Sequence, residues 1–379
     1  MSGPLSIMLV NMHHGWGGQP TVVLGLARGL SARGHACIIG APEGSELLRR
    51  AGEAGVDVLR GLEFRRGFHP ISILRDARIM RRCILERGVQ VVESNGSQDT
   101  WASVIALRPI RDKASLVRWR HNSFPIANHL LNRLLYRRWI DRVVVSSDGI
   151  KHLLVDPGLL NDDEITVVHP SVELSRFEGE FDRAAARAEL GLSDEDLVIA
   201  TVGRLAPEKG HSVLLRAAKL VIEKEARAKF LVIGGGSLGG ELSRLAEDAG
   251  IADHVIFAGF RTDVPRILSA CDVNALTPVS GESFGIALLE GFCAGLPAVA
   301  TDVGGVRSVC RDRETGLLCR PGDADCVAGA ILELLGDSEL RTGFARNGRR
   351  MVEGEFTEEI MLRRAEALFR EVIGGGEAR

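Results

Sequence analysis

Two glutamates in an apolar stretch are the first residues of this sequence whose types and spacing suit chemistry. The segment ESFGIALLEGFCAGLPAVAT begins at Glu282 and predicts a short helix from Phe284 to Ala294, with Glu290 as its only charge. Burying such a carboxylate is costly unless something pairs with it. Free N–H groups at the start of the helix, at Gly285, can hold a ligand oxygen. A polyhydroxylated ligand lying there would donate hydrogen bonds to both carboxylates.

Both glutamates also have structural explanations, which the sequence leaves open. Glu290 can form an ion pair with an arginine of a neighbouring helix. Glu282 can simply match the positive end of the helix dipole.

Two cations occupy an earlier loop, VGRLAPEKGH. Arg204 stands at the end of a predicted strand, and Lys209 stands at the start of the next helix. Cations near a helix N-terminus are electrostatically unfavourable unless an anion accompanies them, and a phosphate would satisfy both. The alternative is a pair of solvated surface charges.

Two glycine-rich loops follow predicted strands. In GWGGQP, Gly17 and Gly18 let the backbone approach a ligand, although a plain strand-to-helix turn explains them equally well. GGGSLG, which begins at Gly234, fits the dinucleotide pattern G-x-G-x-x-G. A dinucleotide site also needs an acid at the end of the next strand, and that strand ends in Ala258 and Gly259. We therefore expect a tight turn that brings the backbone close to a phosphate or sugar.

The composition is that of a globular chain with a large core. Its 379 residues are 45% hydrophobic and 26% charged, which suits two or three domains. Basic residues outnumber acidic ones by 22 to 16 in residues 1–172, and acidic residues lead by 34 to 25 thereafter. Seven scattered cysteines without C-x-x-C and an N-terminus unlike a signal peptide favour a reducing cytoplasmic setting. No apolar run approaches the roughly 18 residues of a membrane span, so we expect at most a peripheral membrane protein.

Strand-like and helix-like runs alternate along the chain, which is typical of parallel sheets covered by helices. The rhythm breaks after HPSVELSRF, where a proline and a charged segment interrupt it. We predict an α/β protein with two doubly wound Rossmann-like domains, residues 1–172 and 173–355. An amphipathic helix at residues 356–379 follows and has the option of packing back on the first domain. The runs that predict strands are SIMLVNM, ACIIGA, VQVVES, ASLVRW, DRVVVSS, DLVIATVG, KFLVIGG, HVIFAGF, CDVNAL and LPAVAT, and those that predict helices in the first half are ILRDARIMRRCILERG and IANHLLNRLLYRRWI.

Together these motifs resemble those of a large family, the group-4 type retaining glycosyltransferases of the GT-B fold. The most specific part of the resemblance is the pair of glutamates. The first begins the segment E-S-F-G, the second follows in the same stretch, and both lie downstream of the segment G-R-x-x-x-E-K-G. The matching pieces cover nearly the whole chain in the family's order: GWGGQPTVVLGLARGLSARGH, VSSDGIKHLL, ITVVHPSVELSRF, VGRLAPEKG, FLVIGGGSLGGELSRLAEDAGI, VIFAGFRTDVPRIL, ESFGIALLEGFCAGLPAVAT and TGLLCRPGD.

The resemblance implies two domains facing each other across a cleft, with a nucleotide-sugar donor held mainly by the second and an acceptor by the first. Arg204 and Lys209 would bind the diphosphate and stabilise it as it leaves. Glu290 would hold the ribose and Glu282 the donor sugar. His121 matches loosely the position of a histidine near the donor sugar, although a histidine after a strand is as often structural. The remaining implied donor-binding residues are Gly17, Gly18, Gly203, Gly235, Arg261, Ser283, Phe284, Gly285 and Ile286.

Such chemistry would need no metal and no cofactor beyond the nucleotide sugar. Departure of a nucleoside diphosphate builds negative charge on the phosphate, which two fixed cations stabilise. The sequence has no Asp-x-Asp to clamp a metal and no carboxylate that we can place as a covalent nucleophile. Both points agree with the front-face mechanism usually proposed for enzymes of this resemblance. The chain departs from the family's pattern at HPSVE, residues 169–173, and at Arg307 and Ser308.

The expected acceptor is a glycan or a lipid-linked molecule of cell-surface or secreted polysaccharide synthesis, with no nucleic-acid partner. Basic helices around Arg75, Arg78, Arg81 and Arg82 and around Arg133, Arg137 and Arg138 could meet an anionic membrane or a phosphorylated acceptor, or could be solvated faces. The alternatives in function are another GT-B enzyme, such as a nucleotide-sugar epimerase or a phosphorylase, and a non-catalytic nucleotide-sugar-binding protein.

Overall fold

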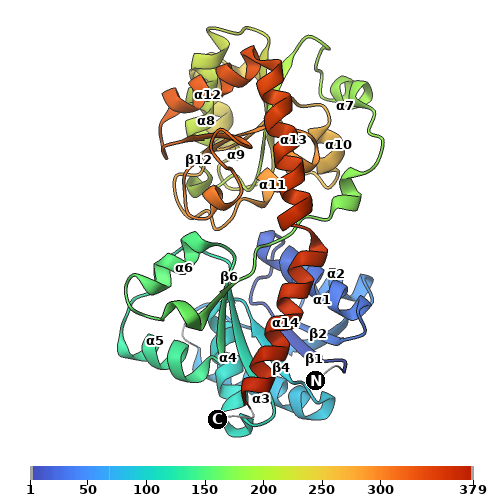
Figure 1. Ribbon diagram of the computed structural model, residues 1–379, viewed down its shortest axis with the longest axis vertical. Helices are drawn as coiled ribbons and strands as arrows, with labels where there is room; N and C mark the ends of the chain where they lie inside the picture. The colour runs from blue at the N-terminus through green and yellow to red at the C-terminus, as the bar shows by residue number, and fades with distance from the viewer. Residues whose placement is uncertain (1–2, 68, 377–379) are drawn as a thin grey trace. The chain divides into compact units, whose positions relative to one another are not determined.

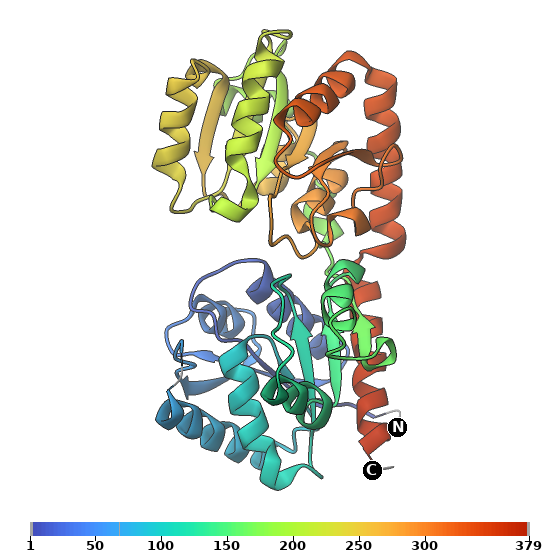
Figure 2. The ribbon, with the colours of Figure 1, turned by 90° about the vertical axis from the view of Figure 1, so that its left-hand side faces the viewer.

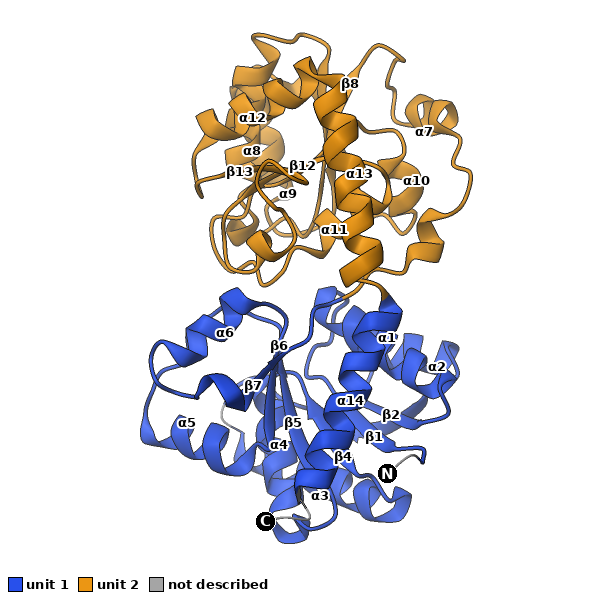
Figure 3. Ribbon diagram, viewed as in Figure 1, with its two compact units in different colours: residues 1–170, 358–379 blue, residues 171–357 orange. Residues whose placement is uncertain are grey.

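A computed structural model describes residues 3–67 and 69–376 (Figure 1). The chain divides into two compact units, each with its own parallel sheet (Figure 3). Unit 1 comprises residues 1–170 and 358–379, and unit 2 comprises residues 171–357. These divisions fall two residues from the domain limits that the sequence predicts.

Unit 1 contains a seven-stranded sheet in the order β3-β2-β1-β4-β5-β6-β7, with every pairing parallel. Its central strands β1 and β4 are almost wholly buried because helices cover both faces of the sheet. The strands are β1 (Ser6–Val10), β2 (Ala36–Pro42), β3 (Asp57–Leu62), β4 (Val91–Ser94), β5 (Ser115–Arg120), β6 (Arg142–Val145) and β7 (Ile165–Val167).

The helices of unit 1 lie on both faces of this sheet. Helices α3 and α4 pack side by side and share one core with β1, β4 and β6 (Figure 2). The helices are α1 (Gly18–Ala32), α2 (Glu46–Glu53), α3 (Pro70–Arg87), α4 (Ser97–Leu107), α5 (Leu130–Leu134), α6 (Asp148–Val155) and α14 (Glu358–Gly376), with the short turns η1 (Arg108–Ile110), η2 (Leu135–Trp139) and η3 (Asp162–Glu164).

The last helix, α14, packs on unit 1, against α1 and β5. Gly29 of α1 permits this contact, since a Cβ there would lie 2.4 Å from a methyl carbon of Leu362. Arg33 adds ion pairs with Glu359 at 2.6 Å and Glu366 at 3.1 Å. Helix α14 therefore docks on α1, the first helix of the chain. The sequence of α14 did not show this docking site.

Unit 2 contains a six-stranded parallel sheet in the order β10-β9-β8-β11-β12-β13. Its strands are β8 (Leu197–Val202), β9 (Ala228–Ile233), β10 (Val255–Gly259), β11 (Val273–Leu276), β12 (Ala298–Thr301) and β13 (Gly316–Cys319). Aspartates begin several of the helices: Asp182, Asp323 and Asp337 each accept a backbone N–H at 2.9 Å as N-caps of α7, α12 and α13.

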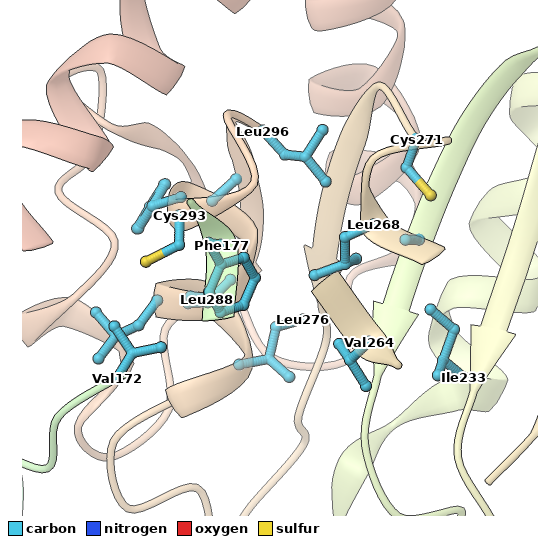
Figure 4. Close-up of a cluster of buried hydrophobic side chains, with 14 of the residues drawn as sticks. Val172, Phe177, Ile233, Val264, Leu268, Cys271, Leu276, Leu288, Cys293 and Leu296 are labelled. Atoms are coloured by element: carbon cyan, nitrogen blue, oxygen red, sulfur yellow. The ribbon is translucent and has the colours of Figure 1, made fainter. Parts of the chain in front are cut away.

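Two cores sandwich this second sheet. Alternate residues of β8 point to opposite faces: Val198 and Ala200 join the core under α10, α11 and α13 (Figure 4), while Ile199 joins the core under α8, α9 and α12. The helices and turns are η4 (Leu174–Phe177), α7 (Arg183–Glu189), η5 (Pro207–Lys209), α8 (His211–Ile222), α9 (Gly239–Asp248), η6 (Ala252–His254), α10 (Val264–Leu268), α11 (Ile286–Cys293), η7 (Val306–Ser308), α12 (Ala324–Gly336) and α13 (Ser338–Glu355).

Two local features differ from the expectations. The helix predicted over residues 126–140 begins only at Leu130, with His129 as its N-cap, and ends as the π-helical turn η2. Cys319 and Cys326 form a disulfide, which a reducing setting does not predict. Across the described part of the chain, no helix is long and apolar enough to cross a membrane.

Candidate active site

The loops that follow the strands of unit 2 are bonded to one another at the carboxyl edge of the sheet. The N–H of Val279 donates to the carbonyl of Glu208 at 3.0 Å, and the hydroxyl of Thr277 donates to the carbonyl of Gly210 at 3.1 Å. Gly210 has φ +64°, and a Cβ there would lie 2.0 Å from the Thr277 carbonyl oxygen, so only glycine fits. The two loops that carry Lys209 and Glu282 are therefore fixed side by side.

Lys209 and Glu282 form an ion pair across these loops. Nζ of Lys209 lies 2.7 Å from Oε2 of Glu282, and the two side chains are 24% and 8% exposed. The carbonyl of Glu282 accepts the N–H of Gly305 at 3.2 Å, while Oε1 of the same residue lies 3.5 Å from the N–H of Phe284. The structure thus brings together a cation and an acid that the sequence assigned to different parts of one ligand.

Arg204 lies in the same loop as Lys209 and also has a carboxylate partner. It forms an ion pair with Glu208, a residue of η5 that the sequence reasoning did not single out. The arginine side chain is 67% exposed, so its guanidinium can turn toward solvent at little cost. Both cations of this loop are therefore neutralised by acids of the same chain when no ligand is bound.

Glu290 lies within α11 and has no such partner. Among the described residues no ion pair or hydrogen bond reaches its carboxylate, and burial raises its pKa to about 7, opposed only by the more distant charge of Arg176. The ion pair with a neighbouring arginine, one of the two explanations that the sequence left open, does not form. At neutral pH this side chain is close to half protonated.

The glycines after β8 and β9 allow backbone to pack on backbone. A Cβ at Gly234 would lie 1.8 Å from the carbonyl oxygen of Gly203, and one at Gly236 would lie 2.3 Å from that of Leu205. The N–H of Leu205 donates to the carbonyl of Gly235 at 3.0 Å. The G-x-G-x-x-G pattern therefore has a structural explanation, because it joins this loop to the one that carries Arg204.

The other predicted donor-binding residues of unit 2 divide between this edge and the core. Gly285 is the left-handed N-cap of α11, with φ +100°. Ser283 and Ile286 flank the start of that helix and are partly buried, whereas the Phe284 ring is buried against Phe356, with ring centroids 5.5 Å apart. The Phe284 side chain is thus part of the core of unit 2.

Arg261 is held in a cluster of acids rather than by the residues above. Its guanidinium forms ion pairs with Asp263 and with Glu189, each at 2.8 Å, and Arg266 joins the same cluster. These carboxylates raise the pKa of Arg261 further above its ordinary value. Within the described part of the chain, no ion pair or hydrogen bond connects Arg261 to Lys209 or Glu282.

In unit 1, Gly17 is the N-cap of α1 and Gly18 is its first residue. A Cβ at Gly17 would meet no atom within 4 Å, so the turn itself does not require glycine. The carbonyl of Gly17 accepts both the N–H and the hydroxyl of Thr21, at 3.1 and 2.9 Å. The space around this position is open to a ligand that approaches the start of the helix.

His121 follows β5 and is fixed by two neighbours. Its Nε2 is hydrogen-bonded to Oδ1 of Asn95 at 2.6 Å, and its ring stacks on that of Trp119 at 5.8 Å. Burial, aided by the charges of Arg118 and His13, lowers the pKa of His121 to about 3. The imidazole is therefore neutral at pH 7 and suits hydrogen bonding rather than charge stabilisation.

The described residues form no cluster of metal ligands. Within residues 3–67 and 69–376, no group of three or more His, Cys, Asp or Glu side chains is placed to hold a metal ion.

Two family models match this chain in succession. Residues 16–176 match the model described as Glycosyltransferase Family 4, and residues 182–351 match the model described as Glycosyl transferases group 1. Together they cover nearly all of both units, in the order that the motifs predict. The chain belongs to the group-4 type glycosyltransferases of the GT-B fold.

Curated relatives of this family member include proteins named D-inositol 3-phosphate glycosyltransferase. The one from Nocardia farcinica is 37% identical over 208 residues, which are 52% of this chain and 46% of the relative. The one from Mycobacterium marinum is 38% identical over 202 residues, with 52% and 42% of the two chains covered. Each match thus spans about half the length of the relative.

Solved structures with the same fold cover nearly the whole chain. A glycosyltransferase from Rickettsia africae has a TM-score of 0.88 at 20% identity, with 98% of this chain and 99% of that one covered. Anabaena HepE, solved with UDP and glucose, has a TM-score of 0.82 at 19% identity, with 96% and 99% covered. At sequence identities of 20% and 19%, these similarities establish the fold of the chain and nothing further.

Sequence reasoning missed two arginines in unit 1 that the structure buries. Arg120 is the last residue of β5, and Arg118 lies two residues before it. Both arginines are 4% exposed. The signal was present, since the segment SLVRWR puts two cations on one face at the carboxyl end of a buried parallel strand.

Proposed function

We propose that this protein is a retaining, metal-independent glycosyltransferase that moves a sugar from a nucleoside-diphosphate sugar to a hydroxyl acceptor. The observation that carries the proposal is the ion pair of Lys209 with Glu282 at the carboxyl edge of the unit 2 sheet. In doubly wound sheets this edge is where ligands bind. A lysine and an acid held together there suit a ligand with a diphosphate beside hydroxyl groups.

In the reaction that we propose, Lys209 and Arg204 stabilise the leaving diphosphate. An ammonium has three N–H donors, and the bond to Glu282 uses one, so the others can reach phosphate oxygens. Arg204 exchanges Glu208 for the diphosphate at little cost because the pair is exposed. The bond between the anomeric carbon and the phosphate oxygen breaks, and its electron pair stays on the diphosphate.

The acceptor oxygen then bonds to the anomeric carbon on the face that the diphosphate leaves. The departing phosphate takes the proton of the acceptor hydroxyl, so no side chain is needed as the base. Glu282 accepts hydrogen bonds from the donor sugar, and the N–H groups around Gly285 bind phosphate or sugar oxygens. The same configuration at the anomeric carbon before and after the reaction is the expected result.

Glu290 fits the ribose in this proposal. Its carboxylate has no donor within the described residues, and two ribose hydroxyls would supply donors and lower its pKa from about 7. Gly203, Gly235, Ser283, Ile286 and the backbone of Phe284 complete the donor site, with Arg261 near the base. Gly17, Gly18 and His121 are assigned to donor binding on the family resemblance alone.

The donor base and the acceptor follow less directly. UDP and glucose are bound in the structure of Anabaena HepE, and this supports a uridine nucleotide sugar as the first donor to test. For the acceptor we propose a glycan or lipid-linked molecule of cell-surface or secreted polysaccharide synthesis. The names of the curated relatives support an alternative, a small phosphorylated polyol.

A peripheral contact with anionic membranes at the cytoplasmic side is part of the proposal, and it is assigned to α5. Leu130, Leu131 and Leu134 are 73%, 49% and 37% exposed there. Beside them Arg137 donates only to the carbonyls of Leu159 and Gly158 and has no carboxylate partner among the described residues.

The basic helix α3 is less suited to this contact. Its Arg75 and Arg82 form ion pairs with Glu63 and Glu86. Flotation of the protein with anionic vesicles at low salt should be lost on Leu131→Asp, and flotation that persists in this variant would contradict the assignment to α5.

A thermal-shift panel of nucleotide sugars, followed by NMR of the product, tests the proposed reaction. A donor that binds the native state raises the melting temperature, and the anomeric coupling of the product reports retention. Product formed from the donor alone, without an acceptor, would favour an epimerase instead. Donor binding without turnover on any acceptor would favour a nucleotide-sugar-binding protein.

A further inference from the structure

A cavity of about 370 Å³ lies at the carboxyl end of β5 in unit 1 and is not used by the donor site above. Its polar wall consists of Ser97 and Thr100 from the first turn of α4, Arg118 and Arg120 from β5, Asn122 and Tyr136. Trp101, Phe124 and Ile126 form an apolar wall. This volume suits one small ligand rather than a folded polymer.

The two arginines of this cavity are buried without an acidic partner. Each is 4% exposed, and among the described residues no carboxylate oxygen lies within 4.0 Å of either guanidinium. Arg118 donates only to the carbonyls of Ser94 and Trp119, at 3.1 and 3.0 Å. Arg120 donates to the carbonyl of Phe124, and its Nε has no hydrogen-bond partner. Buried cations left in this state are costly unless an anion joins them.

Two buried acids, Glu93 and Asp99, interact with the charge of Arg118. Burial raises the pKa of Glu93 to about 8, so this carboxyl is mostly protonated at pH 7. The Asp99 carboxylate accepts the N–H of Gly96 at 2.7 and 2.8 Å, and those of Asn95 and Thr100. Burial raises the pKa of Asp99 and the charge of Arg118 opposes this rise, so Asp99 offsets part of the charge of Arg118, whereas no acid of the described residues does so for Arg120.

The remaining surroundings are also favourable to an anion. Ser97 and Thr100 belong to the first turn of the eleven-residue helix α4, so the positive end of its dipole lies at the cavity wall. Burial lowers the pKa of Arg120, and the charge of Arg118 lowers it further, against the opposing effect of the Tyr136 hydroxyl. The two guanidinium groups therefore repel each other, and an anion between them would relieve that repulsion.

We propose that this cavity binds a phosphate group of the sugar acceptor. Two guanidinium groups and a helix N-terminus match the geometry of a tetrahedral phosphate, and the apolar wall of Trp101, Phe124 and Ile126 covers the ring or chain that carries it. The inference rests on the proposed function, because it names the class of acceptor. The phosphate has two possible sources, a soluble sugar or polyol phosphate and a lipid head group.

The first test is binding of inorganic phosphate, which needs no knowledge of the acceptor. Calorimetric titration of wild type, Arg120→Met and the exposed control Arg28→Met should show one phosphate site that Arg120→Met loses, with at least a ten-fold fall in affinity. Arg120→Lys, which keeps the charge, should retain part of the binding. Equal phosphate binding by all four proteins would overturn the proposal, and circular dichroism of each variant shows that it is folded.

The second test separates the acceptor pocket from the donor site. With a phosphorylated acceptor, the KM of Arg120→Met should rise at least ten-fold, while its affinity for the donor stays at the wild-type level. An unchanged KM would overturn the pocket assignment. If the wild-type protein bound no nucleotide sugar, the proposed function itself would be overturned. The two failures are therefore distinguishable.

The source of the phosphate is decided by two sets of acceptors. Soluble sugar phosphates form one set, and phosphatidic acid in phosphatidylcholine vesicles forms the other, with phosphatidylcholine alone as the blank. Arg120-dependent binding or turnover in either set supports the pocket and identifies the source. Binding in neither set overturns the proposal.

Discussion

The two units each carry a pair of cations at the carboxyl edge of a parallel sheet, and they neutralise those cations in opposite ways. In unit 2, Lys209 and Arg204 have Glu282 and Glu208 as partners from the same chain. In unit 1, Arg118 and Arg120 are more deeply buried, yet they have only neutral oxygens as partners.

This difference indicates two modes of anion recognition. A paired cation costs little when the site is empty and exchanges partners when the ligand enters, so it suits a diphosphate that must also leave. An unpaired buried cation destabilises the empty site and binds any anion that restores neutrality. We therefore expect substitutions in the two pairs to change the free energy of unfolding in opposite directions.

Lys209→Met should have the largest effect. It removes a cation from beside the proposed leaving group and leaves the Glu282 side chain, which is 8% exposed, without its partner. We expect turnover to fall by roughly 100- to 1000-fold and the free energy of unfolding to fall by about 2 kcal/mol. Initial rates and urea unfolding measure the two. The exposed Lys219→Met is the matched control, and Glu282→Gln in the Lys209→Met background should restore most of the stability.

Glu290→Gln tests the unpaired acid of the donor site. The folded-state pKa of Glu290, about 7, lies above the ordinary value, so its contribution to stability is complete below about pH 4.5 and is lost as the pH rises through 7. By pH 8 the glutamine variant should be more stable than wild type by about 3 kcal/mol. The control is the exposed Glu180→Gln. Parallel stability curves for wild type and Glu290→Gln from pH 5 to 8 would show that the carboxyl is not buried as described.

Arg120→Met should raise the stability of the ligand-free protein. The substitution removes an unpaired buried charge and keeps most of the side-chain volume, for a gain of about 1 kcal/mol in the free energy of unfolding. Urea unfolding in a buffer free of phosphate and sulfate is the measurement, with Arg28→Met as the control. A loss of stability equal to that of Lys209→Met would remove the contrast between the two pairs.

Arg204→Ala should have the smallest effect on stability. Its ion pair with Glu208 is exposed, so the free energy of unfolding should change by less than about 0.5 kcal/mol, and less still at high salt. Unfolding at two salt concentrations checks this. A change of 2 kcal/mol would mean that the pair is not the exchangeable contact described.

Most of the fold could be predicted from the sequence, and the strands that were missed share a physical reason. All ten strands that the apolar runs predict are present, whereas β3, β7 and β13 were not singled out. Each of the three lies at an edge of its sheet. Edge strands are short or carry polar residues, as in DVLRGL of β3, so they lack the continuous apolar run of a central strand.

The sequence singles out the residues of the candidate site but not the contacts among them. Glycines, cations and acids after strands indicate a ligand edge, because carboxyl ends of parallel strands meet there. That Lys209 would pair with Glu282, 73 residues away, depends on the loop contact at Gly210 and Thr277. The cavity around Arg120 also depends on tertiary packing, since residues of α4, β5 and the segment near η2 form its walls.

Donor affinity tests the central claim most directly. The nucleotide sugar that gives the largest thermal shift is titrated by calorimetry into wild type, Lys209→Met and Glu282→Gln. We predict at least ten-fold weaker binding to each variant than to wild type. Equal affinity in all three proteins would contradict the claim that this lysine and this glutamate together hold the donor.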